Sequence, residues 1–154
     1  MSEDADQPID FKQVREMLDE KKGRMKLSLS ACAGCTLCAE SCFMFMKHDQ
    51  DPEYMPSYKV LNTLGLLYKK KGKLSRKELE KMSEIAFKNC MLCERCYCPL
   101  GIDSYNMIAF VRSILRSQGI YGAFPHSTGE PQCDCQRDET ARPKPQTQGD
   151  DEAQ

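Results

Sequence analysis

The chain has 154 residues and is close to charge balance, with 22 basic and 23 acidic side chains. A general nucleic-acid-binding protein normally carries an excess of positive charge, so this composition argues against nucleic acid as a partner. Apolar runs such as residues 107–111 are far too short to cross a bilayer, which predicts no direct membrane insertion.

Residues 9–122 are predicted to form one domain between two disordered ends. Residues 1–8 are mostly polar and acidic and have no apolar core of the kind that a signal peptide carries, which predicts a cytoplasmic chain. Residues 123–154 contain four prolines and, after Phe124, no Leu, Ile, Val, Phe or Met. Such a segment buries too little apolar surface to offset its ordering entropy, so we expect a disordered tail.

The first half of the domain shows helical spacing of apolar residues with one interruption. Residues 9–22 predict a short amphipathic helix that ends near Gly23. Residues 27–30 alternate leucine with serine, which predicts a brief extended segment before the first cysteines. The pattern becomes helical again over residues 38–47, and a loop follows.

The second half continues the helical pattern. Residues 57–71 carry an apolar stripe at helical spacing. Ser75 and Glu78 form a capping-box pattern that opens the next helix, and Asp103 or Ser104 caps the last one. No run predicts a strand of useful length. We therefore expect an all-α fold, an α-helical ferredoxin in which two cysteine-rich loops lie between short helices.

Eight of the ten cysteines lie in two tight groups, CAGCTLCAESC and CMLCERCYCP. Three thiolates in a CxxCxxC run can hold one face of a cubane, and in two-cluster ferredoxins the fourth ligand comes from the other motif. The first expected [4Fe–4S] cluster is therefore held by Cys32, Cys35, Cys38 and Cys98. The second is held by Cys90, Cys93, Cys96 and Cys42.

Zinc and disulfide bonds are the alternatives for these cysteines. Structural zinc usually takes two CxxC pairs separated by a longer loop, whereas each group here has three evenly spaced cysteines and a nearby fourth. Disulfide bonds are rare in the reducing compartment that we expect for this chain. Iron–sulfur clusters are therefore favoured. A metal-stabilised structural or interaction module, holding zinc or a redox-inert cluster, is the alternative function.

Two details depart from a regular ferredoxin motif. Only Tyr97 separates the last two cysteines of the second group, whereas three residues separate the last two of the first. This spacing changes the direction in which Cys98 points, although the side chain still suits a ligand aimed at the other cluster. Phe43 stands where ferredoxin-like motifs commonly place proline.

The segments CAGCTLCAESC and NCMLCERCYCPLGID, followed by an arginine-bearing amphipathic stretch, resemble the α-helical ferredoxin domain. Within that group the chain is most similar, over about residues 11–119, to the C-type iron–sulfur subunit of heterodisulfide reductase and its relatives in anaerobic electron-transfer complexes. The resemblance implies an electron-transfer subunit, not itself catalytic, that relays single electrons through two [4Fe–4S] clusters. Its expected partners are a flavin-containing subunit and a catalytic subunit with CCG domains, and any membrane association is peripheral, through partners.

Three further features each keep two interpretations. Cys133 and Cys135 form a CxC pair that is either incidental or a thiol couple for disulfide exchange, and we favour the first. Arg95 is either a solvated side chain or a cation that raises the potential of its neighbouring cluster. The lysine-rich run at residues 69–77 is either a solvated turn or a docking site for an acidic partner.

Overall fold

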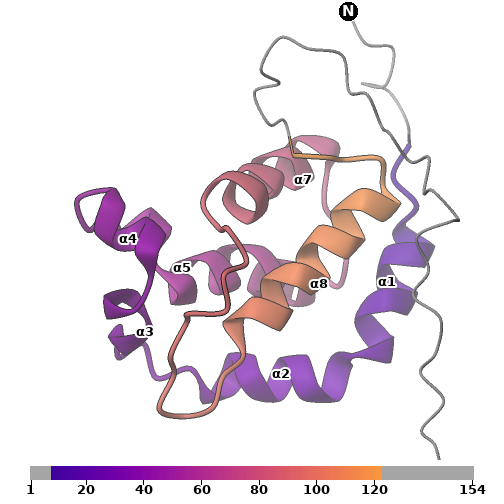
Figure 1. Cartoon of the computed structure of the whole chain (residues 1–154). Helices are drawn as coiled ribbons and strands as arrows, with labels where there is room; N and C mark the ends of the chain where they lie inside the picture. Colours follow the sequence, from indigo (N-terminus) through magenta and orange to yellow (C-terminus); the bar gives the residue numbers. More distant parts are fainter. Residues whose placement is uncertain (1–7, 123–154) are drawn as a thin grey trace, which may run out of the picture. The chain divides into compact units, whose positions relative to one another are not determined.

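A computed structural model of the chain describes residues 8–122, and every regular element in that range is helical (Figure 1). The all-α prediction is confirmed. We expected disorder at residues 1–8 and 123–154. Apart from Pro8, these residues lie outside the described part of the chain, and so do Cys133 and Cys135. Within the described part, no helix combines the length and apolarity that crossing a bilayer requires.

Most helices follow one another with short connections, but residues 89–103, which carry the second cysteine group, separate η4 from α8. α5, the π-helical turn η3 and α6 form one unbroken helical stretch, and α7 continues into the π-helical turn η4. The bounds are α1 Phe11–Glu20, α2 Lys22–Ala31, α3 Leu37–Glu40, α4 Phe43–Lys47, the 3₁₀ turn η2 Pro52–Tyr54, α5 Pro56–Val60, η3 Leu61–Gly65, α6 Leu66–Lys69, α7 Arg76–Ser83, η4 Glu84–Lys88 and α8 Ser104–Ser117.

The region between α1 and the first cysteines differs from the sequence prediction. Only Lys21 interrupts the helices, α2 runs through Gly23, and the expected extended segment at residues 27–30 is helical. The prediction was wrong because an alternation over four residues is too short to distinguish a strand from a helix, on which Leu27 and Leu29 lie on opposite sides. Leu29 packs against the core, whereas Leu27 is 71% exposed. As a result, α2 carries the chain directly to Cys32.

The hydrophobic core is built around α8, which lies among α1, α5 and α7 (Figure 1). Asp103 caps this helix, because its carboxylate accepts a hydrogen bond of 3.0 Å from the backbone N–H of Asn106. One side of the helix is fully covered, with Met107, Ile108, Val111, Ile114 and Leu115 at most 2% exposed. This core fixes the helices from which both cysteine loops leave.

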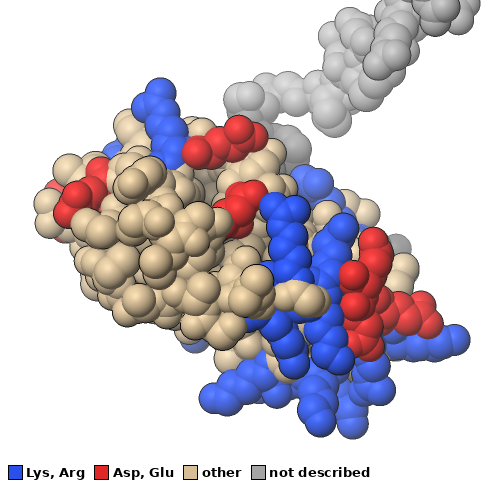
Figure 2. All heavy atoms as spheres, turned by 90° about the horizontal axis from the view of Figure 1, so that it is seen from below, with Lys and Arg blue, Asp and Glu red and all other residues tan. Residues whose placement is uncertain are grey.

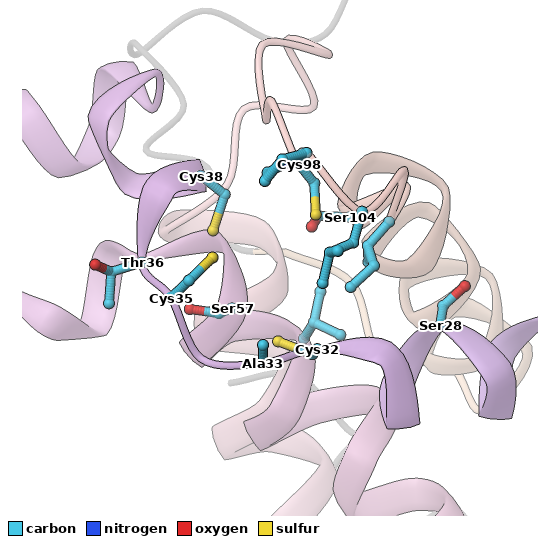
Figure 3. Close-up of a pocket in the computed structure, with 13 residues that line it drawn as sticks. Ser28, Cys32, Ala33, Cys35, Thr36, Cys38, Ser57, Cys98 and Ser104 are labelled. Carbon is cyan, nitrogen blue, oxygen red and sulfur yellow. The ribbon is translucent and has the colours of Figure 1, made fainter.

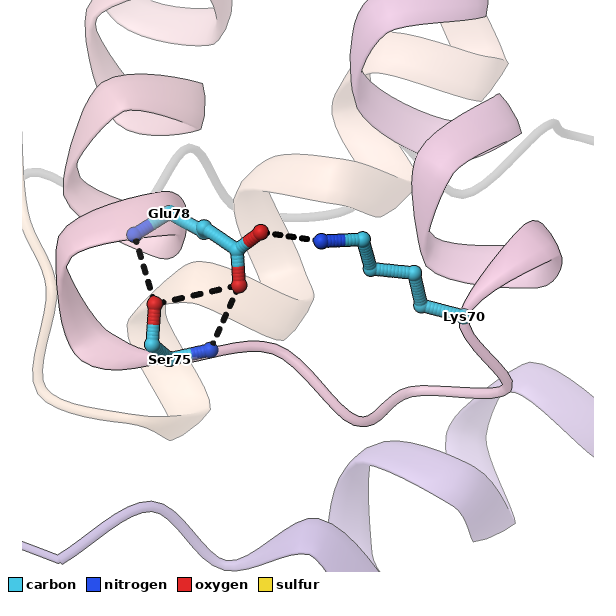
Figure 4. A network of polar contacts seen from close by, with 3 residues as sticks. All are labelled: Lys70, Ser75 and Glu78. Atoms are coloured by element: carbon cyan, nitrogen blue, oxygen red, sulfur yellow. Dashed lines mark hydrogen bonds and ion pairs between the residues drawn. The ribbon is translucent and has the colours of Figure 1, made fainter.

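The turn between α6 and α7 is closed by the predicted capping box (Figure 4). The backbone N–H of Ser75 donates to the Glu78 carboxylate at 2.9 Å, and the N–H of Glu78 donates to the Ser75 hydroxyl at 3.4 Å. Lys70 donates to the same carboxylate. Lys70, followed by Ser75, lowers the pKa of Glu78 to about 2. The stabilisation from this carboxylate is therefore complete above its ordinary pKa of 4.5 and is lost as the pH falls through about 2.

Candidate iron–sulfur sites

Three cysteines of the first group and one of the second line a common pocket (Figure 3). Cys32 caps the end of α2, Cys38 lies in α3, and Cys35 lies in the loop between them. Cys98 reaches the pocket from the loop that follows η4. The sulfur atoms of all four point toward the same hollow. The structure thus brings together the four cysteines predicted for the first cluster.

The lining of this pocket combines apolar side chains with a hydrogen-bond donor. Val60 and Ile102 are among the apolar lining residues, and Ser57 is the donor. Burial raises the pKa of the Cys38 thiol, and hydrogen bonds from the backbone and side chain of Ser57 oppose this shift. Cys32 and Cys98 raise the pKa further, because a thiolate disfavours a second negative charge nearby.

The second predicted set also lies together. Burial, followed by the nearby Cys90, Cys42 and Cys93, raises the pKa of Cys96 to about 12. A thiolate affects the pKa of another thiol only when the two lie close together, so Cys90, Cys42 and Cys93 lie near Cys96. Cys42 and Cys90 are buried, whereas Cys93 is exposed. Cys42 from the first loop therefore lies with three cysteines of the second loop, in the mirror arrangement of Cys98.

The position of Cys42 depends on a break that the sequence analysis missed. A single helix was expected over residues 38–47, and this was wrong, because α3 and α4 are separate. Between them Cys42 has an extended backbone, with φ −86° and ψ 112°. The break turns its side chain away from the pocket of Cys38, so that the Cys42 thiol contacts the carbonyl of Tyr54 at 3.6 Å.

Both cysteine loops repeat the same pair of backbone turns. Gly34 and Leu92 hold equivalent positions before the second cysteine of each loop, with φ of 65° and 52°. Thr36 and Glu94 hold the next equivalent positions, with φ of 62° and 61°. Left-handed backbone is uncommon for residues other than glycine and tends to persist where a site requires it. The repeated turns bend each loop around a compact centre.

The donor chemistry of both sets fits a [4Fe–4S] cluster. Every proposed ligand is a thiol, the type of ligand that iron–sulfur clusters take. Within the described range, no three Cys, His, Asp or Glu side chains are close enough to share a single metal ion. The thiols of the first set instead surround a hollow, an arrangement that suits a cluster of several atoms.

Arg112 from α8 fastens the start of the second loop, a role that the sequence did not reveal. Its Nε donates to the carbonyl of Ala86 at 2.9 Å, and its Nη2 donates to the carbonyl of Cys90 at 2.5 Å. The guanidinium also lies 4.9 Å from the ring centre of Phe87. Burial lowers the pKa of Arg112, because it removes water from around the charged guanidinium. The hydrogen bonds to the two carbonyls replace part of that lost solvation.

Replacing Arg112 with methionine should therefore destabilise the protein. The change leaves two carbonyls without their donor, and we expect a loss of about 1–3 kcal/mol in the free energy of unfolding. Urea unfolding of the iron-loaded protein, followed by circular dichroism, measures the difference. Arg116→Met is the matched control, because the side chain of Arg116 is exposed and lies 5.6 Å from the centre of the same Phe87 ring without a hydrogen bond to any described residue. Equal effects of the two changes would contradict the fastening role.

Lys59 is the second residue that the sequence analysis missed. Its side chain is only 2% exposed, and its Nζ lies 3.7 Å from the Cys42 sulfur. A signal was present, because Lys59 shares a helical row with Thr63 and Leu67, which are both fully buried. Arg95, which the sequence analysis considered as a cation that raises the potential of a neighbouring cluster, is exposed.

The surface divides into a basic part and a largely uncharged part, both visible on the face in Figure 2. A basic groove is lined by Arg15, Lys22, Lys26, Lys69, Lys70, Lys71 and Lys73, with Asp19 among them. Exposed apolar side chains flank both cysteine loops, namely Leu37, Phe43, Met46, Met91, Tyr97 and Leu100. The cysteine loops are thus bordered by apolar surface, and the basic groove lies on α1, α2 and the turn after α6.

Comparison with known proteins agrees with this site. Residues 28–102 match the family model of the 4Fe-4S dicluster domain. The chain is 27% identical over 120 residues to the Hdr-like menaquinol oxidoreductase iron-sulfur subunit 2 of Archaeoglobus fulgidus, which covers 68% of this chain and 21% of that protein. It is 28% identical over 148 residues to the Hdr-like menaquinol oxidoreductase iron-sulfur subunit of Archaeoglobus profundus, and this match covers 80% of this chain and 25% of that protein.

The chain thus spans only about a fifth to a quarter of the length of these two relatives, 21% and 25%. No solved structure matches it.

Proposed function

We propose that the chain is an electron-transfer subunit of an Hdr-like oxidoreductase complex and holds two [4Fe–4S] clusters, from the premise that residues 28–102 match the family model of the 4Fe-4S dicluster domain. The observation that carries the proposal is the pocket in which Cys98 of the second loop joins three cysteines of the first. The similarity to two Hdr-like iron–sulfur subunits supports the kind of complex.

In this proposal the chain's residues hold, separate and shield two cofactors. When bound, each cluster supplies reversible one-electron transfer. One is held by Cys32, Cys35, Cys38 and Cys98, and the other by Cys90, Cys93, Cys96 and Cys42. Val60 and Ile102 line the first site, and α5 supplies side chains toward both sites, Ser57 to the first and Lys59 to the second.

Electrons must enter and leave through partner chains. Exposed apolar side chains around both cysteine loops offer a surface on which a partner can bring its own cofactor close. The basic groove adds attraction for an acidic partner. We propose a flavin-containing subunit and a CCG-domain catalytic subunit as these partners, in a cytoplasmic complex that contacts the membrane only through other chains.

Anaerobic purification followed by metal analysis tests the proposal. We expect a brown protein with about eight irons per chain and paramagnetic signals that appear on reduction with dithionite, as thiolate-bound cubanes give. Far fewer irons with no such signal would overturn the electron-transfer function. A colourless protein that holds stoichiometric zinc would instead establish the alternative, a metal-stabilised interaction module.

A further inference from the structure

Lys59 is a buried cation. Among the described residues it pairs with no carboxylate, and its ammonium group contacts a thiol. It is 2% exposed, and its Nζ contacts the Cys42 sulfur at 3.7 Å. None of the ion pairs between described residues involves it. A buried ammonium is strongly unfavourable unless an opposite charge compensates it. The thiol set of Cys42 is the group in position to carry that charge.

The same helix treats the two sites unequally. Ser57 lies in the pocket of the first set and gives Cys38 neutral hydrogen bonds. Two residues further along α5, Lys59 gives Cys42 of the second set a positively charged donor. α5 therefore presents a neutral donor to one cysteine set and a cationic donor to the other.

We propose that Lys59 raises the reduction potential of the cluster held by Cys90, Cys93, Cys96 and Cys42, so that an added electron resides there in preference to the other cluster. Lys59 acts as a positioning residue through the Cys42 sulfur, which its Nζ contacts. The inference rests on the proposed electron-transfer function and adds the order in which the two clusters fill.

The physical reason is electrostatic. One-electron reduction, with dithionite as the reductant in the test below, adds one negative charge to a thiolate-bound cluster and breaks no covalent bond. A fixed cation at short range in a buried, weakly polarisable environment stabilises that added charge. Exposed cations such as Arg95 are screened by water and salt and have a much smaller effect.

Redox titration with paramagnetic-resonance detection tests the proposal on the iron-loaded protein. In Lys59→Met, which keeps the length of the side chain and removes its charge, one of the two midpoint potentials should fall. We expect the equilibrium constant for reduction to drop about tenfold or more, which is about 59 mV for a one-electron couple. The other midpoint should move by less than a third of that shift.

Two further variants and one control complete the experiment. Lys59→Arg keeps the charge and should show the wild-type midpoint potential. Lys59→Gln keeps a neutral N–H donor, and its midpoint potential should lie between those of Lys59→Met and the wild type. Lys81→Met makes the same chemical change at an exposed position of α7 and should move neither midpoint.

Unchanged midpoints in fully loaded Lys59→Met and Lys59→Gln proteins would overturn the inference and leave the electron-transfer function standing. Loss of iron from both variants, with retention in Lys59→Arg, would also overturn it, because Lys59 would then serve to hold the cluster. Absence of iron from the wild-type protein would refute the proposed function itself.

Discussion

Cys98→Ala is expected to remove one of two clusters and to leave the other intact. Cys98 lies with Cys32, Cys35 and Cys38 in one pocket, so the loss of its thiol leaves that cluster with three protein ligands. The iron content of the anaerobically purified variant should fall from about eight to about four per chain, with the loss of one paramagnetic signal. Cys42→Ala should give the same iron content through the loss of the other signal.

Double substitutions separate crossed ligand sets from sets confined to one loop. If the sets cross, Cys98→Ala combined with Cys35→Ala removes two ligands of the same cluster and should leave about four irons. Cys98→Ala combined with Cys93→Ala should then remove both clusters. The reverse pattern would show that each loop holds its own cluster. Cys133→Ala is the matched control, since Cys133 lies outside both groups, and its iron content should equal that of the wild type.

Leu115→Ala is expected to destabilise the protein by about 2–5 kcal/mol, the usual result of emptying a fully buried leucine site. Leu115 has no exposed surface and lies on α8, which packs against α1, α5 and α7. A domain of this size has only about 5–15 kcal/mol of total stability. Urea unfolding of the iron-loaded variant, followed by far-ultraviolet circular dichroism, should therefore show a markedly lower midpoint.

The control for this change is Leu27→Ala on α2. Leu27 is 71% exposed, so the same removal of side-chain atoms leaves no cavity. Its free energy of unfolding should remain within about 0.5 kcal/mol of the wild type, as is usual for surface positions. Similar losses at Leu115 and Leu27 would mean that α8 is not the centre of the core.

The sequence was informative wherever a signal was local and carried by particular residue types. Ser75 with Glu78 predicted a helix start that the structure contains, and Asp103 is the cap of α8. The apolar stripe of residues 57–71 predicted helical structure that is present, and the last helix begins where the cap at Asp103 or Ser104 predicted it. The spacing of the cysteines predicted two cluster-binding loops, and residues 28–102 match the family model of the 4Fe-4S dicluster domain. Which cysteines form each ligand set remains a prediction.

What the sequence could not supply are contacts between distant segments and short backbone breaks. Arg112 contacts the carbonyl of Cys90 from another helix, and no local pattern encodes that contact. The extended backbone at Cys42 interrupts a stretch whose composition suits a continuous helix. Lys59 was hidden for a different reason, because lysine is normally a surface residue and its place in a buried row was outweighed by that preference.

The pocket that joins Cys38 to Cys98 also constrains how the protein is made. A ribosome releases the first cysteine loop well before it has synthesised the second, because the helices from α4 to η4 lie between them. On a nascent chain the thiols of Cys32, Cys35 and Cys38 are therefore present before the thiol of Cys98 that completes the pocket. If Cys98 supplies the fourth ligand of this pocket, as proposed, iron delivery can be completed only after translation has passed residue 98, and cofactor insertion is then a late step in the protein's maturation.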